Sequence, residues 1–318
     1  MLFLYINIGS LAAFGSTAVE KKYGFPAAFA LPTVVFFIGL VIALASKNKY
    51  VSHPPSSSII LNVCRVVWIA AKHKGDLNYA RPNYYAEGDP TRVLPWNDSF
   101  IDDLRSALSS CKLFLFYPFY WAAYSQLLTN FISQAATMKT NGIPNDMMTY
   151  IDPVMTLILL PILDRAVFPF LRRLGMPVRH VDRMATGFII SGCAMLYATY
   201  IQQAIYSAPP CYSHPRAADC LGGKYPNRVS VLLQIPAYVL IAASEVLASV
   251  AAVEYAYTRA PKSMKSLIMA VYLSTFSAGM LLAALVLPLT VDPKLTWMYF
   301  TLAIETLVAG TAIWFVPI

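Results

Sequence analysis

Eight long apolar runs dominate the chain, and they constrain its fold more than any motif does. Each approaches or exceeds the roughly 20 residues with which a helix crosses a bilayer. Of the 318 residues 58% are hydrophobic and 13% are charged, whereas a soluble domain has about 25% charged residues. We therefore expect an all-α polytopic membrane protein with about eight transmembrane helices embedded in a lipid bilayer. The runs lie at 1–17, 25–46, 108–131, 147–171, 184–206, 229–257, 266–289 and 296–316.

The positions of the basic residues predict the orientation of these helices. Seventeen of the 24 lysines and arginines lie in 47–112, 165–183 and 259–265, which share one side of the membrane if all eight runs cross it. Loops rich in Lys and Arg stay in the cytoplasm, so we expect a cytoplasmic linker and a cytoplasmic C-terminus. The net charge of +8 does not indicate a nucleic-acid partner, because the basic residues are dispersed between the runs.

Residues 47–107 differ from the runs and form a linker. Pro-Pro-Ser-Ser-Ser at 54–58 opens it, and 59–74 then has an apolar face and a basic end. This pattern predicts a helix that lies on the cytoplasmic membrane surface. Residues 75–98 are expected to be irregular, and 100–112 to form an amphipathic helix that leads into the next span.

One carboxylate, Glu245, lies near the middle of the run at 229–257. An acid at that depth costs about 2.5–3.5 kcal/mol even on lenient insertion scales. A water-filled path or a cationic partner is one explanation, and a hydrogen bond to a neighbouring helix is the other. A second acid, Asp152, precedes Pro153 in another run, and Glu305 lies in the last one without an evident role.

Around Glu245 the sequence resembles a known family. Residues 244–266, S-E-V-L-A-S-V-A-A-V-E-Y-A-Y-T-R-A-P-K-S-M-K-S, resemble the tenth transmembrane helix of the proton-dependent oligopeptide transporters of the major facilitator superfamily. Similar matches follow the family's order along the chain. I-N-I-G-S at 6–10 resembles the family's fifth helix, and Y-W-A-A-Y-S-Q at 120–126 resembles the seventh. The match to the seventh helix is closest to fungal members. Asp152-Pro153 resembles the eighth helix, and S-L-I-M-A-V-Y-L-S-T at 266–275 resembles the eleventh.

The resemblance implies a major facilitator superfamily fold in which this chain supplies the last eight of twelve helices. Residues 1–46 are then the last two helices of the N-terminal bundle, 47–107 the cytoplasmic linker and 108–318 the C-terminal six-helix bundle. The implied function is a proton-coupled symporter of di- and tripeptides in the plasma membrane. The proton is the coupling ion, and no other cofactor is implied.

The same resemblance implies a set of substrate-binding residues. Glu245 is expected to bind the peptide amino terminus or to couple the proton. Asn7 is equally well explained by an interhelical hydrogen bond, and Ser125 stands where some bacterial members carry a carboxylate. The implied binding residues are Asn7, Trp121, Tyr124, Gln126, Asp152, Glu245, Tyr272 and Ser274.

Two elements of the family's proton and peptide machinery are missing from the sequence. The Glu-x-x-Glu-Arg motif of the first helix and a cavity Lys of the fourth have no counterpart here, so we expect the chain alone not to transport. The missing helices, or another transporter copy, are its expected partners. The alternatives are a non-transporting membrane protein that pairs with or regulates a full-length transporter, and a relative that carries another small solute.

The five cysteines predict one disulfide. Cys211 and Cys220 lie in an outer loop with Pro, Gly and Asp around them, where oxidation is favoured. Cys64, Cys111 and Cys193 are expected to be free thiols. The cysteines and histidines have no metal-ligand spacing, and the sequence has no nucleophile elbow or phosphate-binding glycine loop, so neither a metal site nor an enzyme is expected.

Overall fold

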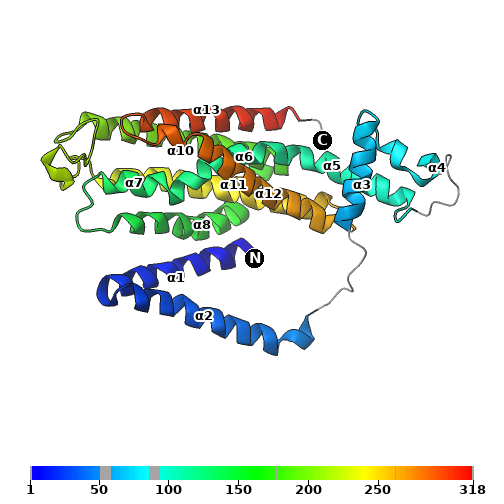
Figure 1. Ribbon diagram of the computed structural model, residues 1–318, viewed down its shortest axis with the longest axis horizontal. Coiled ribbons are helices and arrows are strands. Elements are labelled where there is room, and N and C mark those ends of the chain that lie inside the picture. Colours follow the sequence, from blue (N-terminus) through cyan, green and yellow to red (C-terminus); the bar gives the residue numbers. More distant parts are fainter. Residues whose placement is uncertain (1, 51–58, 86–93, 177, 262, 317–318) are drawn as a thin grey trace.

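The computed structural model describes residues 2–50, 59–85, 94–176, 178–261 and 263–316, and α-helices dominate this part of the chain. Figure 1 shows them as an elongated bundle with a separate hairpin along one side. The α-helices are α1 (Leu2–Tyr23), α2 (Phe25–Ala45), α3 (Ile59–Lys72), α4 (Pro82–Tyr85), α5 (Asp98–Cys111), α6 (Tyr117–Tyr124), α7 (Asn130–Ala136), α8 (Ile151–Ile162), α9 (Phe168–Arg173), α10 (His180–Ser207), α11 (Ile235–Arg259), α12 (Lys265–Leu285) and α13 (Leu295–Trp314).

All eight predicted runs are predominantly helical, which confirms an all-α polytopic membrane protein. Six helical stretches of the described residues are long and apolar enough to span a bilayer by length and composition alone. The first run forms α1, and the run at 108–131 is divided among α6, α7 and 3-10 segments. The six stretches are Phe25–Ala45, Asn145–Arg173, His180–Ser207, Val231–Arg259, Lys265–Leu285 and Leu295–Trp314.

The bundle is organised around helix pairs that pack along their lengths. α10 packs on both α11 and α13, α6 packs on α12, and α8 packs on α11. α1 and α2 form a hairpin, and α1 contacts α8 at the edge of the bundle (Figure 1). Two contiguous groups of buried apolar side chains fill the interior, one toward each end.

Glycines permit the closest of these helix contacts. A Cβ on Gly279 of α12 would lie 2.4 Å from the Cβ of Trp121 and 2.8 Å from the Pro118 carbonyl oxygen of α6. A Cβ on Gly187 of α10 would lie 2.6 Å from the backbone nitrogen of Ala248. Because apolar side chains gain little by leaving lipid, such close backbone packing is a main source of helix association in membranes.

The linker contains the two amphipathic helices that the sequence predicts. α3 covers most of 59–74, and α5 begins at Asp98 after Asn97, whose side chain accepts a hydrogen bond from the backbone nitrogen of Phe100 at 3.0 Å. The expectation of irregular structure at 75–98 is partly wrong, because a 3-10 turn at Leu77–Ala80 and α4 lie within it. The Asp76 carboxylate starts that turn by accepting a hydrogen bond from the backbone nitrogen of Asn78. The predicted Pro-Pro-Ser-Ser-Ser opening lies outside the described residues.

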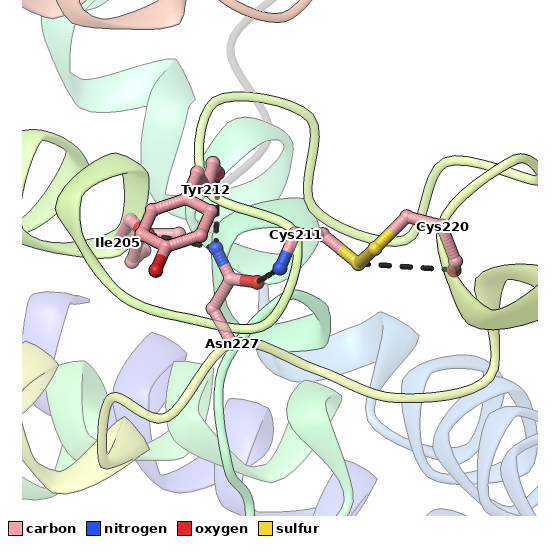
Figure 2. The surroundings of a disulfide bond; sticks show 5 residues. All are labelled: Ile205, Cys211, Tyr212, Cys220 and Asn227. Carbon is pink, nitrogen blue, oxygen red and sulfur yellow. Dashed lines mark hydrogen bonds between the residues drawn. A yellow bond between two sulfur atoms is a disulfide. The ribbon is translucent and has the colours of Figure 1, made fainter.

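At the opposite end of the bundle a cross-linked loop joins α10 to α11. Cys211 and Cys220 form a disulfide, and Figure 2 shows the buried Asn227 beside it. The Asn227 amide nitrogen donates to the carbonyl oxygens of Ile205 at 2.7 Å and Tyr212 at 3.0 Å, and its oxygen accepts from the backbone nitrogen of Cys211 at 3.2 Å. One side chain therefore satisfies three backbone groups of the loop.

We predict that Gly279→Ala destabilises the bundle. The added methyl group collides with the backbone of α6, and such overpacking costs about 1–3 kcal/mol. Thermal unfolding of the purified chain in detergent measures the loss.

Gly39→Ala on α2 is the matched control, because a Cβ there meets nothing within 4 Å. The control should unfold at or above the temperature of the parent chain, since alanine favours helix over glycine. Equal losses in both variants would contradict the proposed role of the α6–α12 contact.

Candidate functional site

The acid that the sequence singles out, Glu245, lies inside the bundle. It projects from α11, and only 7% of its surface is exposed. The Tyr124 hydroxyl on α6 donates a hydrogen bond to its Oε2 atom at 3.3 Å. This long hydrogen bond occupies only part of the acceptor capacity of a carboxylate.

A second acid, Asp152 on α8, approaches the same place. Asp152 is 4% exposed, and its carboxyl interacts electrostatically with that of Glu245. One turn further along α8, the buried Thr156 hydroxyl faces Glu245. Asp152 Oδ1 and Thr156 Oγ1 make no hydrogen bond within the described part of the chain. α8 and α11 thus direct two acids and a hydroxyl into one polar centre.

Hydroxyl groups on α6, α11 and α12 extend this centre. The hydroxyls of Tyr120 and Ser244 lie 3.4 Å apart and share a hydrogen bond. The hydroxyls of Tyr272 on α12 and Ser249 on α11 lie close to each other, and the Tyr272 hydroxyl also interacts electrostatically with Glu245. Four helices therefore contribute to one buried cluster, the acidic cluster, which consists of Tyr120, Tyr124, Asp152, Thr156, Ser244, Glu245, Ser249 and Tyr272.

Aromatic rings form one wall of the acidic cluster. Trp121 meets Tyr124 edge-on at 5.6 Å between ring centroids, and it lies 6.2 Å from the ring of Tyr272. The Trp121 Nε1 atom donates to the Thr275 hydroxyl at 3.0 Å, which joins α6 to α12. This bond fixes the indole plane against the cluster.

Two predicted residues, Ser274 and Gln126, make their hydrogen bonds outside the cluster, and a third, Asn7, lies on another helix. Ser274 is exposed and donates to the Val271 carbonyl oxygen of its own helix at 2.7 Å. Gln126 is buried, and its amide bonds the Ala122 carbonyl oxygen at 2.9 Å and the Asn130 amide at 2.6 Å. Asn7 is buried on α1. Because successive residues differ by about 100° around a helix, Thr275 and not Ser274 faces Trp121.

Sequence reasoning missed Ser244, and it also missed Thr156, Ser249 and Tyr120, for which a signal exists. Each of the last three lies four residues from a residue that was predicted, namely Asp152, Glu245 and Tyr124. Side chains at this spacing share one helix face. A search for hydroxyls one turn from each intramembrane acid finds two of the three.

The fold matches that of solved POT family transporters. The in meso crystal structure of the POT family transporter PepTSo superposes with a TM-score of 0.73 at 20% sequence identity, covering 98% of this chain and 69% of that one. The model of the POT family matches residues 1–303, so the chain belongs to the POT family. This confirms the resemblance to proton-dependent oligopeptide transporters.

Two relatives show how similar the chain is to known proteins and over what length. The peptide transporter PTR2 of Saccharomyces cerevisiae is 40% identical over 315 residues, which are 98% of this chain and 51% of the relative. The peptide transporter imqJ of Aspergillus flavus is 64% identical over 185 residues, 58% of this chain and 36% of the relative. The chain spans about half the length of the yeast relative that it matches almost throughout.

We predict that Tyr124→Phe lowers the stability of the bundle slightly, because Glu245 loses its hydrogen-bond donor. Buried polar contacts in membranes are worth about 0.6 kcal/mol and at most about 1.7 kcal/mol. Thermal unfolding in detergent measures the change.

Tyr200→Phe is the matched control, because 65% of Tyr200 is exposed. It should leave the unfolding temperature unchanged. If Tyr124→Phe also leaves it unchanged, the contact with Glu245 contributes nothing to stability.

Proposed function

We propose that the chain belongs to a proton-coupled symporter of di- and tripeptides, in which the acidic cluster binds the substrate. The observation that carries the proposal is the position of Glu245, a buried acid on a spanning helix that accepts a hydrogen bond from Tyr124. Intramembrane acids are costly and mark substrate or ion paths.

The chemistry of a short peptide fits this cluster. Its amino terminus is a cation that a carboxylate attracts, and its backbone amides need donors and acceptors of the kind that Tyr, Thr and Ser hydroxyls supply. In our proposal Glu245 binds the amino terminus, Tyr124 and Tyr272 bond the peptide backbone, and Trp121 forms a flat wall for the side chain. Asp152 lies on the opposite helix as a second acid.

Proton coupling follows from competition at Glu245. A peptide ammonium and a proton both neutralise the same carboxylate, and an uncompensated charge at this depth is unfavourable. Glu245 is thus expected to exchange one for the other as the protein changes its conformation. The names of the yeast and Aspergillus relatives, both called peptide transporters, support the substrate class.

We also propose the domain division and orientation that the sequence predicts. Residues 1–46 belong to one bundle, 47–107 form a cytoplasmic linker and 108–318 form the second bundle, in the plasma membrane. An exposed apolar stripe on α3 supports a linker helix at the membrane surface. Ile60, Leu61 and Trp68 are each about 60% exposed or more, whereas Val66 on the opposite face is fully buried.

We predict that Glu245→Gln abolishes proton-driven uptake. The chain, extended by the four helices that the family resemblance places before it, should take up a labelled dipeptide at acidic outside pH. The amide keeps the shape of the carboxylate but cannot hold an ammonium ion or a coupling proton, so uptake should fall about tenfold or more, which corresponds to about 1.4 kcal/mol or more. Surface expression should not change.

Glu305→Gln is the matched control, because Glu305 is a half-buried acid of another span outside the acidic cluster. It should retain uptake. Full uptake by the Glu245→Gln variant would refute the assignment. An extended chain that takes up nothing, but changes the uptake of a co-expressed transporter, would favour the regulatory alternative.

We predict further that the linker faces the cytoplasm. A protease added to sealed, right-side-out cells should leave a tag in 47–107 intact and should remove a tag inserted at Gly222 in the cross-linked loop. Cleavage of the linker tag alone would show that the chain has the opposite orientation.

A further inference from the structure

A cavity of about 560 Å³ opens at the end of the bundle opposite the cross-linked loop. It lies where the first residues of α10, the last residues of α11 and the C-terminal end of α13 meet. Tyr255 of its lining lies on α11 about 15 Å along the helix axis from Glu245. The volume of the cavity is typical of a small-molecule site. Its lining residues are Val178, Arg179, His180, Val181, Asp182, Tyr255, Arg259, Trp314 and Val316.

One of the arginines around this cavity is not paired with an acid within the described residues. Arg179 is held by Asp182, with nitrogen to oxygen distances of 3.0 and 3.3 Å. Arg183, just outside the lining, is paired with Glu254 at 2.7 Å. Arg259 is exposed and lines the cavity from α11, and it makes no hydrogen bond or salt bridge in the part of the chain that the structure describes. Its guanidinium carries five donors suited to phosphate oxygens.

The rim of the cavity adds further donors. His180 lies beside Arg259, and no side chain caps the first turn of α10, to which His180, Val181 and Asp182 belong. The first backbone N–H groups of a helix lack intrahelical acceptors and favour anions. The cavity therefore presents donors from two helices. Its acidic lining residue, Asp182, is paired with Arg179, and Glu254, which lies 3.7 Å from His180 Nδ1, is paired with Arg183.

The remaining lining is apolar and aromatic. Tyr255 is almost fully buried and meets His180 edge-on at 6.3 Å between ring centroids, while Trp314 is 46% exposed at the end of its span. Tryptophans at the ends of spanning helices lie at the level of lipid headgroups. A polar wall and an apolar wall thus meet at the membrane boundary.

We propose that this cavity binds a phosphate group, with Arg259 as its principal ligand. Two sources share this chemistry, namely the headgroup of an anionic phospholipid and free phosphate. Arg259 bonds the phosphate oxygens, and the start of α10 supplies further donors. With a phospholipid, Trp314 and Val316 contact the adjoining glycerol and acyl carbons. The lining of this cavity shares no residue with the acidic cluster.

The test is a calorimetric titration of the purified full chain in detergent with three probes. These are short-chain phosphatidylglycerol, phosphatidylcholine of the same chain length and inorganic phosphate. We expect saturable binding of phosphatidylglycerol. Arg259→Gln should weaken it about tenfold, as expected for the loss of one charge-assisted hydrogen bond. Arg259→Lys keeps the charge and should lose less.

Arg173→Gln is the matched control, because Arg173 is an exposed arginine on α9 at the same end and does not line the cavity. It should bind as the parent does. An unchanged unfolding temperature verifies that each variant is folded, and Arg259→Lys provides a second test if the Gln variant is not.

The probes separate the two sources. If phosphatidylglycerol binds much more tightly than inorganic phosphate and both depend on Arg259, the ligand is a lipid headgroup. If inorganic phosphate binds as tightly, the ligand is the free anion. The proposal is overturned if neither probe saturates, if phosphatidylcholine binds as well as phosphatidylglycerol, or if Arg173→Gln weakens binding as much as Arg259→Gln.

Discussion

The bilayer supplies no water to polar groups, and this constraint shapes the whole bundle. The carboxyl groups of Glu245 and Asp152 lie inside the bundle, and each needs polar surroundings from the protein or from a ligand. Tyrosine and other hydroxyl side chains on α6, α8, α11 and α12 supply part of these surroundings. The acidic cluster therefore holds the most demanding polar groups of the fold, and in our proposal a charged substrate binds there.

Close packing around the acidic cluster holds its helices in register. Gly279 lets α12 approach α6 beside Trp121, and Gly187 lets α10 approach α11 at Ala248. Regular helix is interrupted nearby, by 3-10 segments on both sides of α6 and by a π-helical segment, Leu163–Val167, after α8. The contacts are tight where helices meet, whereas the backbone departs from α-helix within the helices that carry Tyr124 and Asp152.

The two ends of the bundle are stabilised differently. At the end with the disulfide, neutral amide side chains form a chain of contacts, and the Tyr206 hydroxyl donates to the Asp292 carboxylate. Gln134 of α7 donates to Gln202 of α10 at 2.8 Å and accepts from Gln234 at 2.7 Å, joining three helical segments. At the other end charged pairs such as Arg183 with Glu254 connect α10 and α11. Neutral hydrogen bonds resist salt, while ion pairs at a wet surface are weak and exchangeable. The helix contacts at the charged end can therefore break and re-form more easily than those at the disulfide end.

The sequence by itself determined the helices, the membrane class, the family and the burial of Glu245, because apolar length and the cost of an intramembrane acid are local properties of the chain. It also predicted the amphipathic character of α3. Only the tertiary structure decided which side chains meet. It placed Asp152 and Thr156 of α8 beside Glu245 of α11, and it turned Thr275 rather than Ser274 toward Trp121. The rotation of each helix depends on how its small residues pack against neighbours that are distant in the sequence, and no single segment contains that information.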